Sequence, residues 1–181
     1  MGNVLQSHVL AIDETSIKAS NKKKGKLHQG YYIPVYGDQD EMVFNYSPSK
    51  SRQHIEAVLS GYQGVILSDG NSAYEEYAKK MDEVVHAQCW SHSRRYFERA
   101  HDQEPVESKQ ALDMIAKLYS ADNKIEDDWR AEKKIEHRAN HCQPIVADFL
   151  AGVISNGSVW IYYPTIRWQR HWLMAVIGSN H

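Results

Sequence analysis

The sequence predicts a mixed α/β fold, one sheet flanked by helices, and three observations lead to this class. Two apolar runs, His8–Ile12 and Gly64–Leu67, have the length of buried strands, and an aspartate follows each closely. Between them lie two runs rich in aromatic and β-branched residues, which favour strands. Later strands alternate with segments in which apolar residues recur at helical spacing. Alternating strands and helices indicate an α/β architecture.

Five strands are expected in the first half of the chain. They are Val9–Asp13, Tyr31–Tyr36, Met42–Tyr46, Val65–Asp69 and Val84–Cys89. The second and third are joined by the polar residues 37–40, which indicates a hairpin. The stretch Lys18–Gly30 is polar and rich in lysine, so we expect an exposed hairpin tip with Gly25 at its turn.

Four helices follow from the spacing of apolar residues. They are expected at Ser49–Ser60, Asn71–Met81, Ser91 to about Asp102, and Glu107 to about Arg138. In the second, Tyr74 and Tyr77 share one face and are expected in the core. Three strands in a meander, followed by alternating helices and strands, form the order of a ribonuclease H-like core. The predicted fold is therefore a ribonuclease H-like mixed sheet flanked by helices, with a helical C-terminal extension.

Asp13 and Asp69 are the first candidate site residues, because each ends an apolar strand. Two such strands side by side would hold the two carboxylates a few ångströms apart, where they repel each other unless a cation lies between them. Carboxylates paired in this way bind Mg²⁺ in enzymes that transfer phosphoryl groups. For each aspartate alone, a simple turn is the alternative. The neighbouring Glu14 is expected on the opposite face of the strand.

Three motifs in order carry a likeness to a known family. They are Ala11–Thr15, Ser68–Tyr74 and Cys89–Phe97. Together they resemble the transposases of the insertion-sequence-66 family, whose core contains DET, then DGY-x-x-Y, then C-x-x-H-x-R-R-x-F. The likeness extends from about residue 8 to about residue 150. Asn71 stands where the family usually has tyrosine, at a position that need not bind a metal.

The resemblance implies a DDE-type transposase that cuts and joins DNA. Asp13 and Asp69 would be catalytic and would bind Mg²⁺ or Mn²⁺, with transposon ends and target DNA as partners and self-association of the chain left open. The family's third acid is a glutamate near Asn-Asn-x-x-Glu-Arg, and no segment matches that motif. Asp127, Asp128 and Glu132 are the substitutes that the sequence offers.

The family segments that bind zinc or form a helix-turn-helix before the core also have no match. We therefore expect a central piece of the core, inactive by itself. Two alternatives stay open. One is a non-catalytic remnant that keeps the fold and weak binding of DNA or a partner, and the other is a ribonuclease H-like nuclease acting alone.

Further candidates are contacts to DNA or to zinc. His92, Arg94 and Arg95 lie near the start of a predicted helix, where phosphate binds readily, although Glu98 could pair with an arginine instead. The lysines Lys22, Lys23 and Lys24 are candidates for DNA contact or for a solvated turn. His86, Cys89 and His92 have a spacing that could bind zinc, with His141 and Cys142 as further ligands. The alternative is a strand residue, a core cysteine and a histidine in the first helical turn.

The charge and composition of the chain limit its partners and its location in the cell. The net charge of −2 gives no overall attraction to DNA, so contacts must be local. Two cysteines and the lack of a signal peptide predict a cytoplasmic protein without a disulfide framework. The uncharged run Phe149–Ile166 contains glycine and proline and is not expected to span a membrane. We expect a core at 1–150 and a divergent tail at 151–181 that results from a frame change, or else a genuine C-terminal element.

Overall fold

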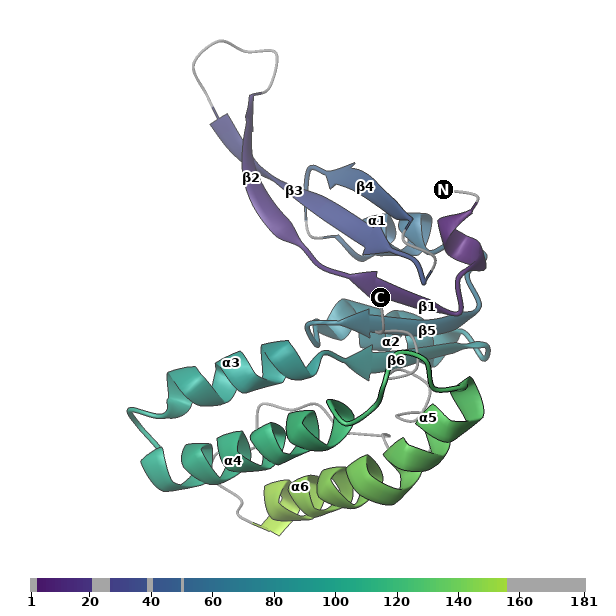
Figure 1. Cartoon of the computed structure of the whole chain (residues 1–181). Coiled ribbons are helices and arrows are strands. Elements are labelled where there is room, and N and C mark those ends of the chain that lie inside the picture. Colours follow the sequence, from purple (N-terminus) through teal and green to yellow (C-terminus); the bar gives the residue numbers. More distant parts are fainter. Residues whose placement is uncertain (1–2, 21–26, 39–40, 50, 156–181) are drawn as a thin grey trace. The chain divides into compact units, whose positions relative to one another are not determined.

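The computed structural model describes residues 3–20, 27–38, 41–49 and 51–155 (Figure 1). The chain divides into two compact units, of which the first covers residues 1–88 and contains the sheet. The second begins at Cys89 and is helical in its described part. The mixed α/β class predicted from the sequence is therefore confirmed.

The sheet of the first unit has six strands. They are β1 (Val9–Ile12), β2 (Thr15–Ser20), β3 (Leu27–Tyr36), β4 (Met42–Ser47), β5 (Gly64–Ser68) and β6 (Val84–Gln88). The order is β2-β3-β1-β5-β6, and β4 pairs with the other edge of β3. The pairs β1–β5 and β5–β6 are parallel, whereas β3 is antiparallel to β1, β2 and β4. The expected parallel pairing of the two strands that lead to the aspartates is thus confirmed.

The polar stretch after Asp13 is more regular than expected. Residues 15–20 form β2, which pairs with β3 from Thr15↔Tyr32 to Ser20↔Leu27. A strand was missed here because β2 adds no residue to the hydrophobic core, so backbone pairing rather than apolar alternation maintains it. The expected turn, with Lys22, Lys23 and Lys24, lies outside the described residues.

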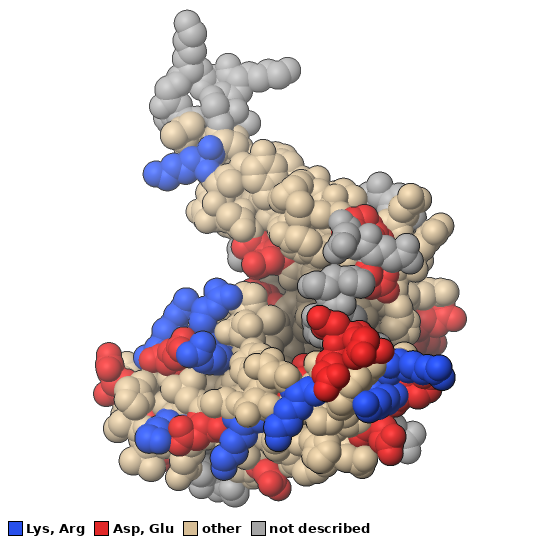
Figure 2. Space-filling view, in the orientation of Figure 1, with Lys and Arg blue, Asp and Glu red and all other residues tan. Residues whose placement is uncertain are grey.

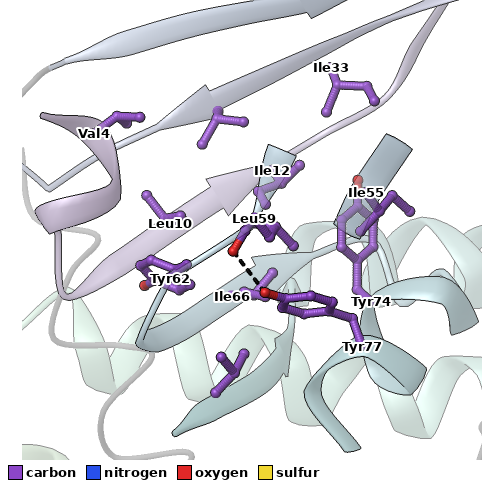
Figure 3. Packing of buried hydrophobic residues seen from close by; sticks show 12 residues of the cluster. Val4, Leu10, Ile12, Ile33, Ile55, Leu59, Tyr62, Ile66, Tyr74 and Tyr77 are labelled. Atoms are coloured by element: carbon purple, nitrogen blue, oxygen red, sulfur yellow. Dashed lines mark hydrogen bonds between the residues drawn. The ribbon is translucent and has the colours of Figure 1, made fainter. Parts of the chain in front are cut away.

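The core of the first unit is built from the sheet and two helices, α1 (Arg52–Val58) and α2 (Ser72–Lys80). Side chains of these helices and of the segment after α1 pack on the inner side of β1, β3 and β5 (Figure 3). The hydroxyl of Tyr77 donates a hydrogen bond to the carbonyl oxygen of Leu59, 2.7 Å away, so its polar end is satisfied inside the core. Tyr74 and Tyr77 are both buried, as predicted.

The second unit contains four α-helices and a π-helical turn in its described part. They are α3 (Trp90–Ala100), α4 (Pro105–Asp122), α5 (Ala131–His137), the π-helix Arg138–Cys142 and α6 (Gln143–Ser155). The expectation of one helix from Glu107 to about Arg138 is wrong. Asn123, Asp127 and Asp128 carry short polar side chains that hydrogen-bond to nearby backbone and favour turns over a helix interior. The chain therefore leaves the helix at Asn123.

Aromatic packing holds these helices together. The rings of Trp90 and Phe97 both meet Phe149 edge to face, at centroid distances of 5.2 and 5.9 Å. The guanidinium of Arg138, almost fully buried, donates through Nε to Asp122 at 2.8 Å.

No helix in the described part is long and apolar enough to cross a membrane. The boundary at residue 150 stays a prediction, and residues 156–181 lie outside the described part.

Candidate active site

The pairing of β1 with β5 brings Asp13 and Asp69 to the same end of the sheet. The register pairs Val9 with Val65 and Ala11 with Leu67, an offset of 56 positions. Asp13 and Asp69 are separated by the same 56 positions, so they face each other one step beyond the ends of the two strands. Neighbouring strands lie about 4.8 Å apart, which makes the two residues neighbours across the sheet.

Asp13 is held through its backbone while its side chain stays accessible. Its amide donates to the carbonyl oxygen of Pro34 on β3, at 3.3 Å. One carboxylate oxygen, Oδ1, accepts a hydrogen bond from the amide of Glu14 at 2.8 Å. The residue is exposed. Asp13 therefore presents a carboxylate of fixed position to the solvent.

Asp69 is fixed by the tight turn that joins β5 to α2. Its Oδ1 accepts a hydrogen bond from the amide of Asn71 at 3.1 Å, and the side chain of Asn71 caps α2 by accepting from the amide of Ala73 at 3.0 Å. Gly70 has φ of +86°, and a Cβ there would lie 2.0 Å from Nε2 of Gln88. Glycine meets both requirements at this position.

Glu14 lies with these residues, contrary to the expectation that it would turn away. Its Oε1 accepts from the hydroxyl of Tyr74 at 3.1 Å and from the side-chain Nδ2 of Asn71 at 3.4 Å. The alternation of side chains applies inside a strand, and β1 already ends at Ile12. The contact between Tyr74 and Glu14 was not expected from the sequence, which placed Tyr74 in the core only. The signal available for it was a tyrosine five positions after Asp69.

The electrostatics of this end of the sheet are strongly negative. Burial raises the pKa of Tyr74 far above its ordinary value, and Glu14, Asp69 and Asp13 raise it further. The pKa of this one phenol is thus raised by all three carboxylates. It remains protonated at neutral pH and can only donate to Glu14.

A divalent cation would suit this environment. Mg²⁺ is commonly bound by one or two carboxylates, with water and substrate phosphates completing its shell, and Asp13 with Asp69 matches that donor set. Across the described residues, no group of three histidine, cysteine or acidic side chains could hold a metal by itself. The substitutes Asp127, Asp128 and Glu132 are all exposed, and the described geometry does not gather them into a metal site.

His86 has a structural environment that the sequence did not reveal. Its Nε2 lies 2.8 Å from the hydroxyl of Ser68, the residue before Asp69, and its ring stacks on Tyr74 at 6.3 Å. Burial lowers the pKa of His86 to about 4, against the opposing influence of Glu75 and Asp69. The imidazole is therefore neutral at physiological pH and supports the strand that leads to Asp69.

The proposed zinc ligands are not gathered into a site in the described part of the chain. His92 lies in the first turn of α3, as the alternative expected. Cys89 is only partly buried and caps α3 after β6 has ended at Gln88, so its expected position in the core is wrong. Burial raises the pKa of Cys142 to about 11, so at neutral pH its thiol is protonated and unsuited to zinc.

The candidates for DNA contact on α3 differ in their partners. Arg94 forms an ion pair with Glu98 at 2.9 Å, which is the alternative that the sequence allowed. Arg95 is exposed on the same helix, and His92 is partly buried. Arg95 is therefore an exposed arginine near the N-terminal end of α3.

The family model described as "Transposase IS66 family" matches residues 1–157. The match includes both aspartates, the Asp69–Tyr74 turn and the motif on α3. No curated protein and no solved structure matched the chain.

Proposed function

Because the chain belongs to the IS66 family of transposases, we propose that its first unit is a metal-dependent DDE core in which Asp13 and Asp69 are catalytic. The observation that carries this proposal is the shared offset of 56 positions, which makes the two aspartates neighbours at the ends of parallel strands. The central position of β1, antiparallel to β3 and parallel to β5, supports a ribonuclease H-like arrangement. The family match supports DNA transposition as the process.

Asp13 and Asp69 would hold Mg²⁺ or Mn²⁺. Such an ion supplies activation of a water or a DNA 3′-hydroxyl for in-line attack on a phosphodiester. The residues around the two aspartates have their own tasks. Tyr74 and Asn71 orient Glu14 through hydrogen bonds, and the turn at Gly70 fixes Asp69. Their effect is to keep the carboxylates in place before substrate arrives.

DNA would be bound by local contacts, since the chain has a net charge of −2. Arg95 is the best candidate on α3, because Arg94 already pairs with Glu98. His92 could position DNA from the first turn of the same helix. Lys22, Lys23 and Lys24 stay candidates from their charge alone. Contacts of this kind weaken steeply with salt and do not depend on sequence.

We further propose that this chain performs strand transfer poorly by itself. In-line displacement with two metals requires a further acid that completes the second metal site. No third carboxylate joins Asp13 and Asp69 in a metal-binding group within the described residues. The same observation favours the second candidate function, a remnant that keeps the fold and weak DNA binding.

Thermal melts with and without millimolar Mg²⁺ or Mn²⁺ test the metal site. An ion that binds the native state only, at about ten times its Kd, adds about 1.4 kcal/mol and raises Tm by a few degrees. Asp13→Asn and Asp69→Asn should abolish this rise. Asp82→Asn, which removes an exposed negative charge elsewhere in the first unit, is the matched control and should keep it.

A rise that survives in both aspartate variants would place the ion elsewhere and reject the metal site. Strand transfer is tested separately, with Mn²⁺ and a transposon-end duplex. We expect none. Strand transfer that disappears in Asp69→Asn would contradict the expected inactivity and would point to an acid such as Glu132 as the missing ligand.

A further inference from the structure

A second surface of the first unit has a different character. On β3 and β4, residues directly opposite each other share a face, and so do residues two positions apart along a strand. The register pairs Tyr32 with Tyr46, and Phe44 with Pro34. The face opposite to the core side therefore presents a group that we call the aromatic face, which consists of Tyr32, Tyr36, Met42, Phe44 and Tyr46.

The aromatic face is open to solvent. Phe44 is 60% exposed, and the other four side chains are 43% to 47% exposed. Single exposed apolar residues are ordinary, but a contiguous group of this size marks a binding surface. The next residues along β3, Ile33 and Val35, point the other way and are buried in the core. The strands are therefore anchored on one side and leave the rings uncovered on the other.

The rings are held in position before any partner binds. The ring of Tyr46 covers Gly30, since a Cβ added to that glycine would lie 2.7 Å from the ring. Tyr32 meets Tyr46 edge to face at a centroid distance of 6.1 Å. The hydroxyl of Tyr46 is 3.4 Å from Nε2 of His28. Little orientational freedom would be lost when a flat ligand stacks on these side chains.

The aromatic face itself carries no charged side chain. Lys18 is the one charged residue on the strands β2, β3 and β4, and it pairs with Gln29, which shares the face of Ile33 and Val35, so Lys18 lies on the face opposite to the aromatic face. Figure 2 shows mostly uncharged side chains, in tan, over these strands. At the other end of β3, Asp38 accepts from the amide of His8 and Glu41 from the hydroxyl of Ser7. The aromatic face is therefore uncharged and suits the flat, uncharged sides of bases rather than phosphates.

We propose that the aromatic face binds single-stranded DNA by stacking unpaired bases on its rings. A duplex keeps the flat sides of its bases covered and presents phosphates, and the described residues of this face include no lysine or arginine to meet them. Unpaired bases expose their flat sides, and stacking on tyrosine and phenylalanine tolerates any base. Side chains on one face of a strand recur about every 7 Å, which leaves room for a base at each ring.

The inference rests on the proposed function in taking DNA as the partner. The test uses the full chain in EDTA, with labelled (dT)₂₀ and a 20-bp duplex, read by fluorescence anisotropy at low salt. We expect tighter binding of (dT)₂₀. Phe44→Leu should weaken it about tenfold, the usual effect of losing one stacked ring, whereas Phe44→Trp should retain it. Tyr119→Leu removes an exposed ring in the second unit and should leave binding unchanged.

Equal binding of (dT)₂₀ by the parent and Phe44→Leu would overturn the proposal. It would also fall if sedimentation showed a dimer of the parent that Phe44→Leu converts to a monomer, because the face would then join two copies. Melting temperatures verify that the variants fold. Because Phe44 is mostly exposed, its replacement should not disturb the fold. Phe44→Leu should keep the rise of melting temperature with Mg²⁺, so failure of the metal site and failure of the aromatic face are told apart.

Discussion

The acidic end of β1 and β5 and the aromatic face of β3 and β4 belong to one sheet, yet they hold their side chains in different ways. At the acidic end, hydrogen bonds fix the polar groups: Asp69 binds the amide of Asn71, and Glu14 binds Tyr74. On the aromatic face, rings lie on the sheet surface and are largely exposed. The comparison teaches that parallel strand ends suit chemistry that needs fixed charges, whereas the antiparallel surface suits binding by contact area.

This difference has an energetic side. Substitutions at the acidic end should cost folding stability, because they disturb buried and hydrogen-bonded groups. Substitutions on the aromatic face should leave stability unchanged and alter binding alone. Four measurements test this contrast, from the largest expected effect to the smallest.

The largest effect concerns pH and His86. Its pKa is about 4 in the folded chain and 6.5 when unfolded, so the unfolded state binds more protons between these values. Stability is therefore fully present above pH 6.5 and declines as the pH falls toward 4, by up to about 3 kcal/mol. Urea unfolding of the metal-free protein at several pH values measures it. His86→Phe should flatten the decline; an unchanged pH slope would refute the assignment.

The next effect concerns the turn at Gly70. Gly70→Ala imposes a positive φ on a residue with a side chain and forces Gln88 to move, at a cost of about 2 kcal/mol. Gly61 also has a positive φ, of 78°, with open space around it, so Gly61→Ala should cost about 1 kcal/mol. Chemical denaturation gives both values. Adding Gln88→Ala should bring Gly70→Ala down to the level of Gly61→Ala, and equal costs of the two single variants would exclude the clash.

A smaller effect separates two buried tyrosines. Tyr74→Phe removes a donor to the carboxylate of Glu14 and should cost about 1.5 kcal/mol, as hydrogen bonds to charged groups do. Tyr77→Phe removes a bond to the neutral carbonyl of Leu59 and should cost about 1 kcal/mol. The difference should disappear in a Glu14→Gln background, which removes the negative charge and keeps the length of the side chain. If it persists there, the charge of Glu14 is not its cause.

The smallest effect completes the contrast. Phe44→Ala on the aromatic face should change the free energy of unfolding by less than about 0.5 kcal/mol, because the side chain is mostly exposed already. The same denaturation experiment measures it. A loss of about 2 kcal/mol would mean that the ring supports the fold, and the contrast between the two surfaces would fail.

Much of the first unit could be predicted from its sequence, since the strands that enter the core carry clear apolar runs. The runs before Asp13 and Asp69 predicted β1 and β5 and their parallel pairing, and the motif intervals predicted the family. The roles of the two aspartates as metal ligands stay a prediction. The strand β2 was missed because its side chains contribute nothing to the core and its apolar alternation is limited to Ile17 and Ala19.

Other features depend on contacts that no local pattern reveals. Glu14 turns toward Tyr74 because β1 ends one residue before Asp13, and strand ends cannot be read to a single residue from sequence. The environment of His86 depends on Ser68, eighteen positions away on the next strand. In the second unit, the apolar stripe of the long predicted helix ends near Ala121, and the acidic residues after it were misjudged as a solvated helical face.

The bond from the amide of Asp13 to the carbonyl oxygen of Pro34 has a consequence for proton exchange with water. Pro34 lies in β3, the same strand whose earlier part pairs with β2 and whose outer edge pairs with β4. The amide hydrogen of Asp13 can exchange for deuterium only when β3 separates locally from that residue. The exchange rate of this single amide therefore reports how often the middle of the sheet opens beside the acidic end, and the measurement needs no ligand.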